Sequence, residues 1–155
     1  MLPPKLIPFP GYDLPLRAEP IDRTFHGLLA VGLLDDIRDR WRSTLIAPTN
    51  AAFDALPWSF EDLLGQPSLA EVRFDLFEYL VVPGDLVVGE RRTIEGSSIR
   101  IEDGQVLGRF GRAARILRSF VSGNLRVHVV DACVLPASPA IYVDAANDAC
   151  EERSC

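Results

Sequence analysis

The sequence predicts an α+β fold, with helices in the first half of the chain and strands in the second half. Apolar residues recur at helical spacing before Pro83, whereas β-branched runs interrupted by glycine or asparagine follow it. The 155 residues include 48% hydrophobic and 25% charged side chains, a balance typical of one globular domain. Because the helices and strands are segregated, the pattern favours α+β over a repeated βαβ arrangement.

The first predicted helix lies within residues 21–41, where apolar side chains recur three and four positions apart. This stripe consists of Phe25, Leu28, Leu29, Leu33, Leu34 and Ile37. Asp22 or Thr24 is expected to cap its start. His26 lies on the same helix and is expected to be a partly buried, hydrogen-bonded histidine rather than a catalytic base.

Shorter elements follow the first helix. Residues 43–48 predict a buried strand, and residues 50–56 and 59–65 predict short helical turns. A longer helix is expected to begin at Ser68, which forms a capping box with Glu71. The chain is expected to become extended again by Val81.

The second half predicts hairpins and a final alternating strand. Asp103 and Gly104 are typical of a two-residue hairpin turn. In the final run one face is expected to carry Val127, Val129, Asp131 and Cys133, and the other face His128, Val130 and Ala132.

Charge and hydropathy exclude several classes of protein. The net charge is -6 and the basic residues are scattered, so no nucleic-acid partner is predicted. No run reaches the roughly 18 apolar residues that predict a transmembrane segment. Prolines interrupt the start of the chain, so no signal peptide is predicted there.

Neither a metal or cofactor site nor a catalytic site is predicted. Cys133 lies in an apolar run and is expected to be a buried hydrophobic residue. Cys150 and Cys155 either close a small disulfide loop in an exported protein or remain free thiols. His128 is expected to face away from Cys133 and Asp131, so these residues form no nucleophile and base pair.

Three segments resemble the fasciclin domain family. Residues 44–57, TLIAPTNAAFDALP, are similar to its first signature, and residues 123–136, GNLRVHVVDACVLP, to its second. Residues 76–86, LFEYLVVPGDL, are similar to its central segment. The resemblance implies a wedge of two β-sheets joined by a layer of short helices. It places a domain at residues 21–137, after a proline-rich arm at 1–20 and before a tail at 138–155.

The resemblance also implies that the first signature has a structural role. Leu45 and Ile46 are expected in a buried strand that Pro48 ends. Thr49 or Asn50 is expected to cap the next turn, from which Phe53 and Leu56 pack inward. The carboxylate of Asp131 is expected to find its donors near Thr49 and Asn50.

The function that the resemblance implies is a non-enzymatic interaction module in adhesion or matrix association. A protein partner or self-association is expected, in a secreted, periplasmic or cell-surface location. The expected partner surface consists of Tyr79, Leu80, Val81 and Pro83. Secondary positions are Thr49, Asn50, Asp54, His128 and Asp131. The family usually has histidine after the tyrosine, so Leu80 weakens an adhesive role for this surface.

Two alternatives remain open. Some fasciclin-like proteins hold apolar ligands such as carotenoids, and a cleft for a small apolar ligand is expected to be lined by Phe60, Phe74, Phe77, Tyr79 and Leu80. The other alternative is a specialised enzyme built on the same scaffold.

Overall fold

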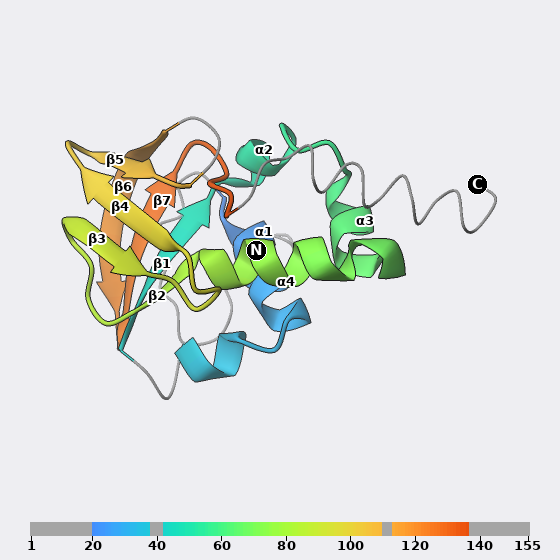
Figure 1. Ribbon diagram of the computed structural model, residues 1–155, viewed down its shortest axis with the longest axis horizontal. Coiled ribbons are helices and arrows are strands. Elements are labelled where there is room, and N and C mark those ends of the chain that lie inside the picture. The colour runs from blue at the N-terminus through green and yellow to red at the C-terminus, as the bar shows by residue number, and fades with distance from the viewer. Residues whose placement is uncertain (1–19, 38–41, 110–112, 137–155) are drawn as a thin grey trace, which may run out of the picture.

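The computed structural model describes residues 20–37, 42–109 and 113–136. Its elements in chain order are α1 (Asp22–Ala30), β1 (Ser43–Pro48), α2 (Asn50–Phe53), α3 (Phe60–Gly65), the 3-10 helix η3 (Pro67–Leu69), α4 (Ala70–Tyr79), β2 (Val81–Pro83), β3 (Gly89–Arg92), β4 (Ser98–Glu102), β5 (Gln105–Leu107), β6 (Ala114–Ser122) and β7 (Leu125–Val130). Figure 1 shows the helices on one side of the molecule and the strands on the other, which confirms the α+β prediction.

The strands form a seven-stranded sheet in the order β2-β1-β7-β6-β5-β4-β3. The sheet has two halves that meet at β6, because Ala114 and Arg115 pair with β5 while Ile116–Ser122 pair with β7. These halves are the two layers of the expected wedge. The sheet is nearly closed, since the N–H of Ile94, just after β3, donates to the carbonyl of Val81 at 2.9 Å.

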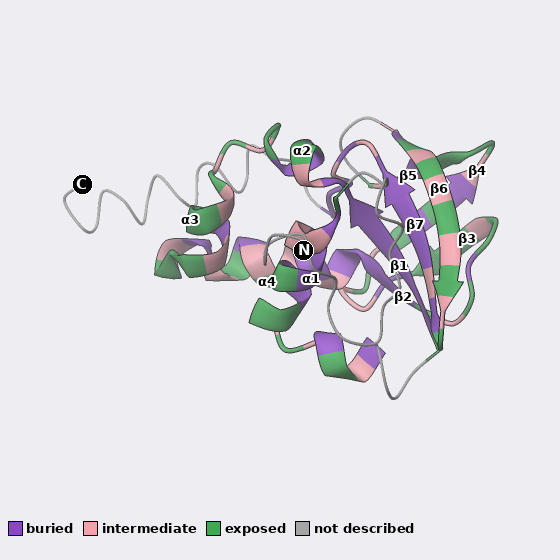
Figure 2. Ribbon diagram, turned by 180° about the vertical axis from the view of Figure 1, so that it is seen from behind, coloured by how far each residue is buried: buried purple, intermediate pink, exposed green. Residues whose placement is uncertain are grey.

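Strand β1 lies at the centre of the first half. It is antiparallel to β2 and parallel to β7, with Leu45 opposite Val127. All six of its residues are buried, and Figure 2 shows β1 and β7 as the buried strands of the sheet. The strand ends at Pro48, where the Thr49 hydroxyl caps α2 by accepting a hydrogen bond from the N–H of Ala52 at 3.2 Å. The predicted strand, its stop and its cap are confirmed.

The predicted side-chain cap of the first helix is wrong, and the helix is shorter than the predicted apolar stripe. Helix α1 has no side-chain cap and ends at Ala30, before Gly32 turns the chain with a φ of 79°. The Thr24 hydroxyl donates instead to the carbonyl of Pro48 at 3.0 Å, because Thr24 lies on the buried side of the helix against the end of β1. Asp22 accepts a hydrogen bond from the side chain of Asn50 at 2.7 Å. His26 is exposed rather than partly buried.

The predicted capping box of the longer helix is also wrong. Ser68 lies inside η3, and α4 begins after it at Ala70 without a side-chain cap. Pro67 starts the helical path before Ser68, because its fixed φ suits the first position of a helix. The serine that caps a helix is Ser59, whose hydroxyl accepts from the N–H of Asp62 at 3.1 Å at the start of α3.

The predicted hairpin turn is confirmed between β4 and β5. Asp103 and Gly104 both have positive φ, at 52° and 73°, and the flanking residues Glu102 and Gln105 pair with each other. This is the backbone geometry that matches the twist of two antiparallel strands.

Helices α1 and α4 approach closely at Gly27. A Cβ atom on Gly27 would lie 2.0 Å from ring atoms of Phe77, whose side chain is fully buried. The ring of Phe77 also stacks on that of Phe53, with 6.0 Å between their centroids. The ring of Phe77 therefore lies against both Gly27 of α1 and Phe53 of α2.

We predict that Gly27→Ala destabilises the protein by about 1–3 kcal/mol, because the steric overlap outweighs the higher helix propensity of alanine. Gly65→Ala is the matched control, since a Cβ atom at Gly65 meets nothing within 4 Å. The free energy of unfolding is measured by urea denaturation. Equal stability of the two variants would contradict the close approach.

Candidate functional site

Three of the four expected partner residues belong to the core. Tyr79, Leu80 and Val81 are 0% exposed, and only Pro83 reaches the surface. The Tyr79 hydroxyl donates to the carbonyl of Ser98 at 2.7 Å and accepts from the N–H of Arg109 at 2.9 Å. The side chain of Tyr79 thus ties α4 to the second half of the sheet. What the chain presents to solvent in this region is Pro83 and the residues that follow it.

Two of the secondary positions, Asn50 in α2 and Asp54 just after it, join α2 to α1. The Arg23 guanidinium donates to the carboxylate of Asp54 at 2.9 Å and to the carbonyl of Asn50 at 2.7 Å. The backbone N–H of Arg23 donates to the side-chain oxygen of Asn50 at 3.0 Å. The Asp54 side chain is 72% exposed, so this ion pair lies at the surface and contributes little stability.

Asp131 does not find its donors at Thr49 and Asn50, so that prediction is wrong. Its carboxylate accepts from the backbone N–H of Arg115 at 2.8 Å. Asp131 lies just past the end of β7, where the antiparallel strand β6 is its neighbour, and this position explains the choice of partner.

Of the three cysteines, only Cys133 lies within the described residues. Cys133 is half-buried and free, and burial raises the pKa of its thiol to about 12. The thiol is therefore neutral near pH 7. Cys150 and Cys155 lie outside the described residues, as do residues 1–19 of the predicted arm at 1–20 and the whole predicted tail at 138–155.

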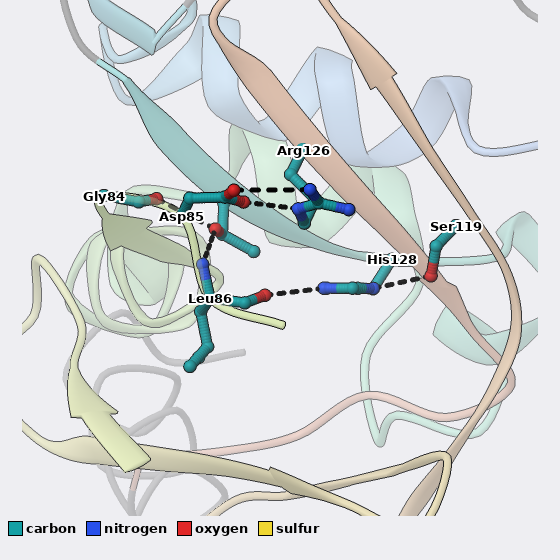
Figure 3. Close-up of polar contacts among 7 residues, drawn as sticks. Gly84, Asp85, Leu86, Ser119, Arg126 and His128 are labelled. Atoms are coloured by element: carbon teal, nitrogen blue, oxygen red, sulfur yellow. Dashed lines mark hydrogen bonds and ion pairs between the residues drawn. The ribbon is translucent and has the colours of Figure 1, made fainter. Parts of the chain in front are cut away.

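The loop of residues 84–88, here called the anchored loop, connects β2 to β3 and is held to the sheet at its start. The Thr44 hydroxyl donates to the carbonyl of Gly84 at 2.9 Å and accepts from the N–H of Leu86 at 2.7 Å. The N–H of Gly84 donates to the carbonyl of Arg42 at 2.8 Å. These contacts fix both the path and the direction of the loop (Figure 3).

Two charged side chains hold the loop to β7. The Arg126 guanidinium donates from two nitrogens to the two carboxylate oxygens of Asp85, one of these contacts being 3.3 Å long. The hydrogen bond from Arg126 holds the pKa of Asp85 below its usual range, and the same bond raises the pKa of Arg126. Both groups are therefore charged at neutral pH, and the pair has the two-pronged geometry that fixes a guanidinium in one orientation.

His128 gives the loop a further, buried anchor. Its ring lies between the carbonyl of Leu86, 2.8 Å from Nε2, and the hydroxyl of Ser119, 2.6 Å from Nδ1 (Figure 3). A carbonyl can only accept, so Nε2 carries the hydrogen and Nδ1 of the neutral ring accepts from Ser119. Burial is the main cause that lowers the pKa of His128. The neutral tautomer that satisfies both neighbours is therefore the stable one.

The anchored loop ends in two exposed apolar side chains. Val87 is 54% and Val88 is 70% exposed, although Leu86 beside them is buried. A loop usually loses conformational entropy when binding holds it in one conformation. This loop is already fixed by the contacts of Thr44, Asp85 and Leu86. The arrangement presents an apolar tip in a fixed position.

The pair of Ser119 and His128 is a contact that the sequence reasoning missed. The signal that could have found it is the hairpin between β6 and β7, whose register places these two residues opposite each other. A serine hydroxyl bonded to a histidine is also the start of a nucleophilic site. Here the histidine takes part in anchoring Leu86, and neither residue lines the pockets of about 80, 420 and 430 Å³ that the structure describes.

Most of the residues expected to line an apolar cleft lie in the core instead. Phe77, Tyr79 and Leu80 are fully buried in the core, whereas Phe74 is 43% exposed. An apolar groove of about 420 Å³ lies elsewhere, between the α2 region and the segment after β7. It is lined by Ala51, Ala52, Ala55, Leu56, Pro57, Trp58, Asp131, Ala132, Cys133 and Leu135.

Within residues 20–37, 42–109 and 113–136, no helix is long and apolar enough to cross a membrane. The same residues contain no group of three or more His, Cys, Asp or Glu side chains that could hold a metal ion.

We predict that the stability of the protein falls as the pH decreases below about 6.5, because the unfolded chain binds a proton at His128 before the folded protein does. The loss continues until the pH passes the lowered pKa of the folded state. His128→Asn removes the titrating ring, so its unfolding free energy should depend less steeply on pH in this window. The check is urea denaturation of both proteins at a series of pH values. Identical pH profiles would show that His128 is not buried in its neutral form.

Comparisons with known proteins find both relatives in sequence and a neighbour in fold. The chain is 31% identical over 110 residues to the immunogenic proteins MPB70 of Mycobacterium bovis and MPT70 of Mycobacterium tuberculosis, a match that covers 68% of this chain and 55% of each relative. It is 29% identical over 114 residues to protein sll1483 of Synechocystis, covering 69% of this chain and 62% of that protein. The chain thus spans only a little over half the length of these curated relatives.

The fold is similar to a solved structure, a FAS1 domain pair from the insect cell adhesion molecule fasciclin I. The TM-score is 0.54 at 17% identity, and the match covers 75% of this chain and 45% of that chain. No family model matches the sequence. The relatives, the shared fold and the two signatures on the paired strands β1 and β7 together show that the chain belongs to the fasciclin-like family.

Proposed function

We propose that the chain is a non-enzymatic interaction module that binds a protein partner through the tip of the anchored loop. The observation that carries the proposal is that hydrogen bonds hold the loop in place while the side chains at its tip are exposed. Val87 and Val88 are more than half exposed, while Leu86 next to them is tied to His128 and Thr44. Pro83, from the partner surface expected from the sequence, is exposed at the other end of the same segment.

A loop that is already fixed lowers the free-energy cost of binding a partner. Exposed apolar side chains gain free energy when a partner covers them, and a partner that meets a fixed loop does not have to order it. The charged pair of Asp85 and Arg126 lies beside the tip and supplies a polar rim. An apolar centre with a polar rim is the usual organisation of a protein interface.

The family supports the biological setting. The structural neighbour comes from an insect cell adhesion molecule, and adhesion or matrix association is the role that we propose for this chain. The proposed location is secreted, periplasmic or at a cell surface, with residues 21–137 as the domain. Thr49, Asn50, Asp54 and Asp131 are assigned to architecture in this proposal, since each takes part in a contact that joins two elements.

The test replaces the two valines of the tip by serine. We predict that Val87→Ser/Val88→Ser reduces adhesion of cells from the source organism to the immobilised protein by at least about 10-fold, with stability changed by less than about 0.5 kcal/mol. The matched control is Leu29→Ser/Phe74→Ser, which removes two exposed apolar side chains from α1 and α4. Adhesion that is lost equally in both variants would show general stickiness rather than a site at the loop.

The apolar groove supports a second candidate function, the binding of a small apolar ligand. Its volume of about 420 Å³ lies within the range of small-molecule sites, and alanine, leucine, proline and tryptophan side chains form most of its lining. Asp131 is the charged residue at its border. Such a lining suits a ligand that is largely hydrocarbon.

The ligand hypothesis is tested on protein purified from its own source. We predict that native mass spectrometry with an absorbance spectrum detects a co-purifying apolar molecule, and that Ala55→Trp, which fills the groove, abolishes its retention. Gly65→Ala serves as the control because Gly65 does not line the groove. An apo mass for the wild-type protein would remove this candidate and leave the interaction module.

A further inference from the structure

A polar cavity of about 430 Å³ lies on the outer face of the second half of the sheet. Strands β3, β4 and β5 supply most of its lining, and Figure 1 shows these strands side by side. Ile99 and Ile101 of β4 are buried in the core, so Ser98 and Arg100, which alternate with them, point to the opposite face. The volume lies within the range of small-molecule sites.

Arginine is the commonest charged residue in this cavity. Arg92 of β3, Arg100 of β4 and Arg109 after β5 line it, and Glu90 is the one carboxylate among the described lining residues. The whole chain has the opposite balance, with 16 basic and 22 acidic residues. The cavity is therefore a locally positive region on an acidic protein, and such a region favours an anionic ligand.

Two of these guanidinium groups have hydrogen-bond donors to offer. Within the part of the chain that the structure describes, the Arg92 side chain forms no ion pair or hydrogen bond. Arg100 contacts Glu102 from its Nε at 3.0 Å, and no contact among the described residues uses its two terminal nitrogens. This exposed ion pair contributes little stability, so it does not prevent a ligand from binding. Arg109 also interacts with other residues, so the anion is assigned to Arg92 and Arg100.

The register of β3 and β4 brings Arg92 and Arg100 close together. Arg92 pairs with Ser98 of β4, and Arg100 lies two residues further along that strand. The two arginines are therefore diagonal neighbours on one face, a spacing of roughly 7–8 Å that long side chains can bridge. Each planar guanidinium can donate two parallel hydrogen bonds to the oxygens of an anionic group.

The rest of the lining suits a ligand that is rich in hydroxyl groups. The hydroxyls of Ser97 and Ser98 can donate or accept, and the carboxylate of Glu90 accepts from O–H donors. Leu107 adds an apolar surface against which the C–H groups of a sugar ring can pack. The described lining contains no aromatic side chain on which a nucleobase could stack.

We propose that this cavity binds an acidic saccharide, a sugar chain that carries carboxylate or sulfate groups. Arg92 and Arg100 hold the anionic group, while the two serines and Glu90 bind hydroxyl groups of the sugar. None of the described lining residues belongs to the anchored loop, so this is a second binding activity that does not depend on the partner proposed there. Because both arginines are exposed, binding is expected to weaken as the salt concentration rises.

The test is isothermal titration calorimetry of the full chain at low salt with two probes, an oligogalacturonate and a sulfated dextran oligosaccharide. We expect at least one probe to bind, and the probe that binds identifies the anionic group as carboxylate or sulfate. Arg92→Gln should increase its Kd by at least about 5-fold, because charge-assisted hydrogen bonds are lost. Arg91→Gln is the matched control, since Arg91 lies on the other face of β3 and does not line the cavity. Its Kd should stay within about 2-fold of the wild-type value.

A second measurement uses the unaltered protein and locates the bound probe. In amide NMR spectra the signals of Gly96, Ser97 and Gly108 should shift on addition of the probe, whereas those of Val87 and Val88 should not. Failure of both probes to bind would overturn the proposal, as would shifts confined to residues outside the cavity. Equal binding of neutral dextran or of an oligoglutamate peptide would also overturn it, because the site would then not select an acidic saccharide.

Discussion

The parallel pairing of β1 with β7 is the constraint on which the rest of the structure depends. Ser43–Pro48 lies beside Leu125–Val130, although about half of the chain separates them in sequence. Parallel neighbours need a long connection, and here α2, α3, α4 and the strands β2 to β6 form that connection. Both strands are buried, so the pairing cannot shift by one residue without moving a charged or polar side chain into the wrong face. The two family signatures are the sequences of these two strands.

The same register creates the anchored loop. Thr44 lies opposite Arg126 in the parallel pair, and paired residues point to the same face of a sheet. His128, two positions further along β7, shares that face. The three side chains that hold the loop therefore come from two adjacent strands, and the loop reaches them because β2 pairs with the other edge of β1. The candidate site follows from the pairing of the core strands rather than from a separate design of the loop.

Sequence reasoning was successful where local chemistry decides the structure. Pro48 ended a strand, Thr49 capped a turn, and Asp103 with Gly104 formed a hairpin, because each of these choices depends on residues within a few positions. It failed where a side chain had competing partners. Thr24 was free to cap its own helix but donates to Pro48, a choice that only the packing of α1 on β1 determines.

The candidate site likewise contains features that the sequence could predict and features that it could not. The partner surface expected at Tyr79 lies in the core, because the short passage from α4 to β2 runs beneath the second half of the sheet, where Ser98 accepts from the tyrosine. The sequence identified this segment by its similarity to the central segment of the family but could not decide between burial and exposure. The contact between Ser119 and His128 was accessible in principle, since a tight hairpin fixes which residues face each other. Strand β6 then shows why topology must be known as well. Its bulge allows it to pair with β7 and β5 in turn, and this change of partner joins the two halves of the wedge.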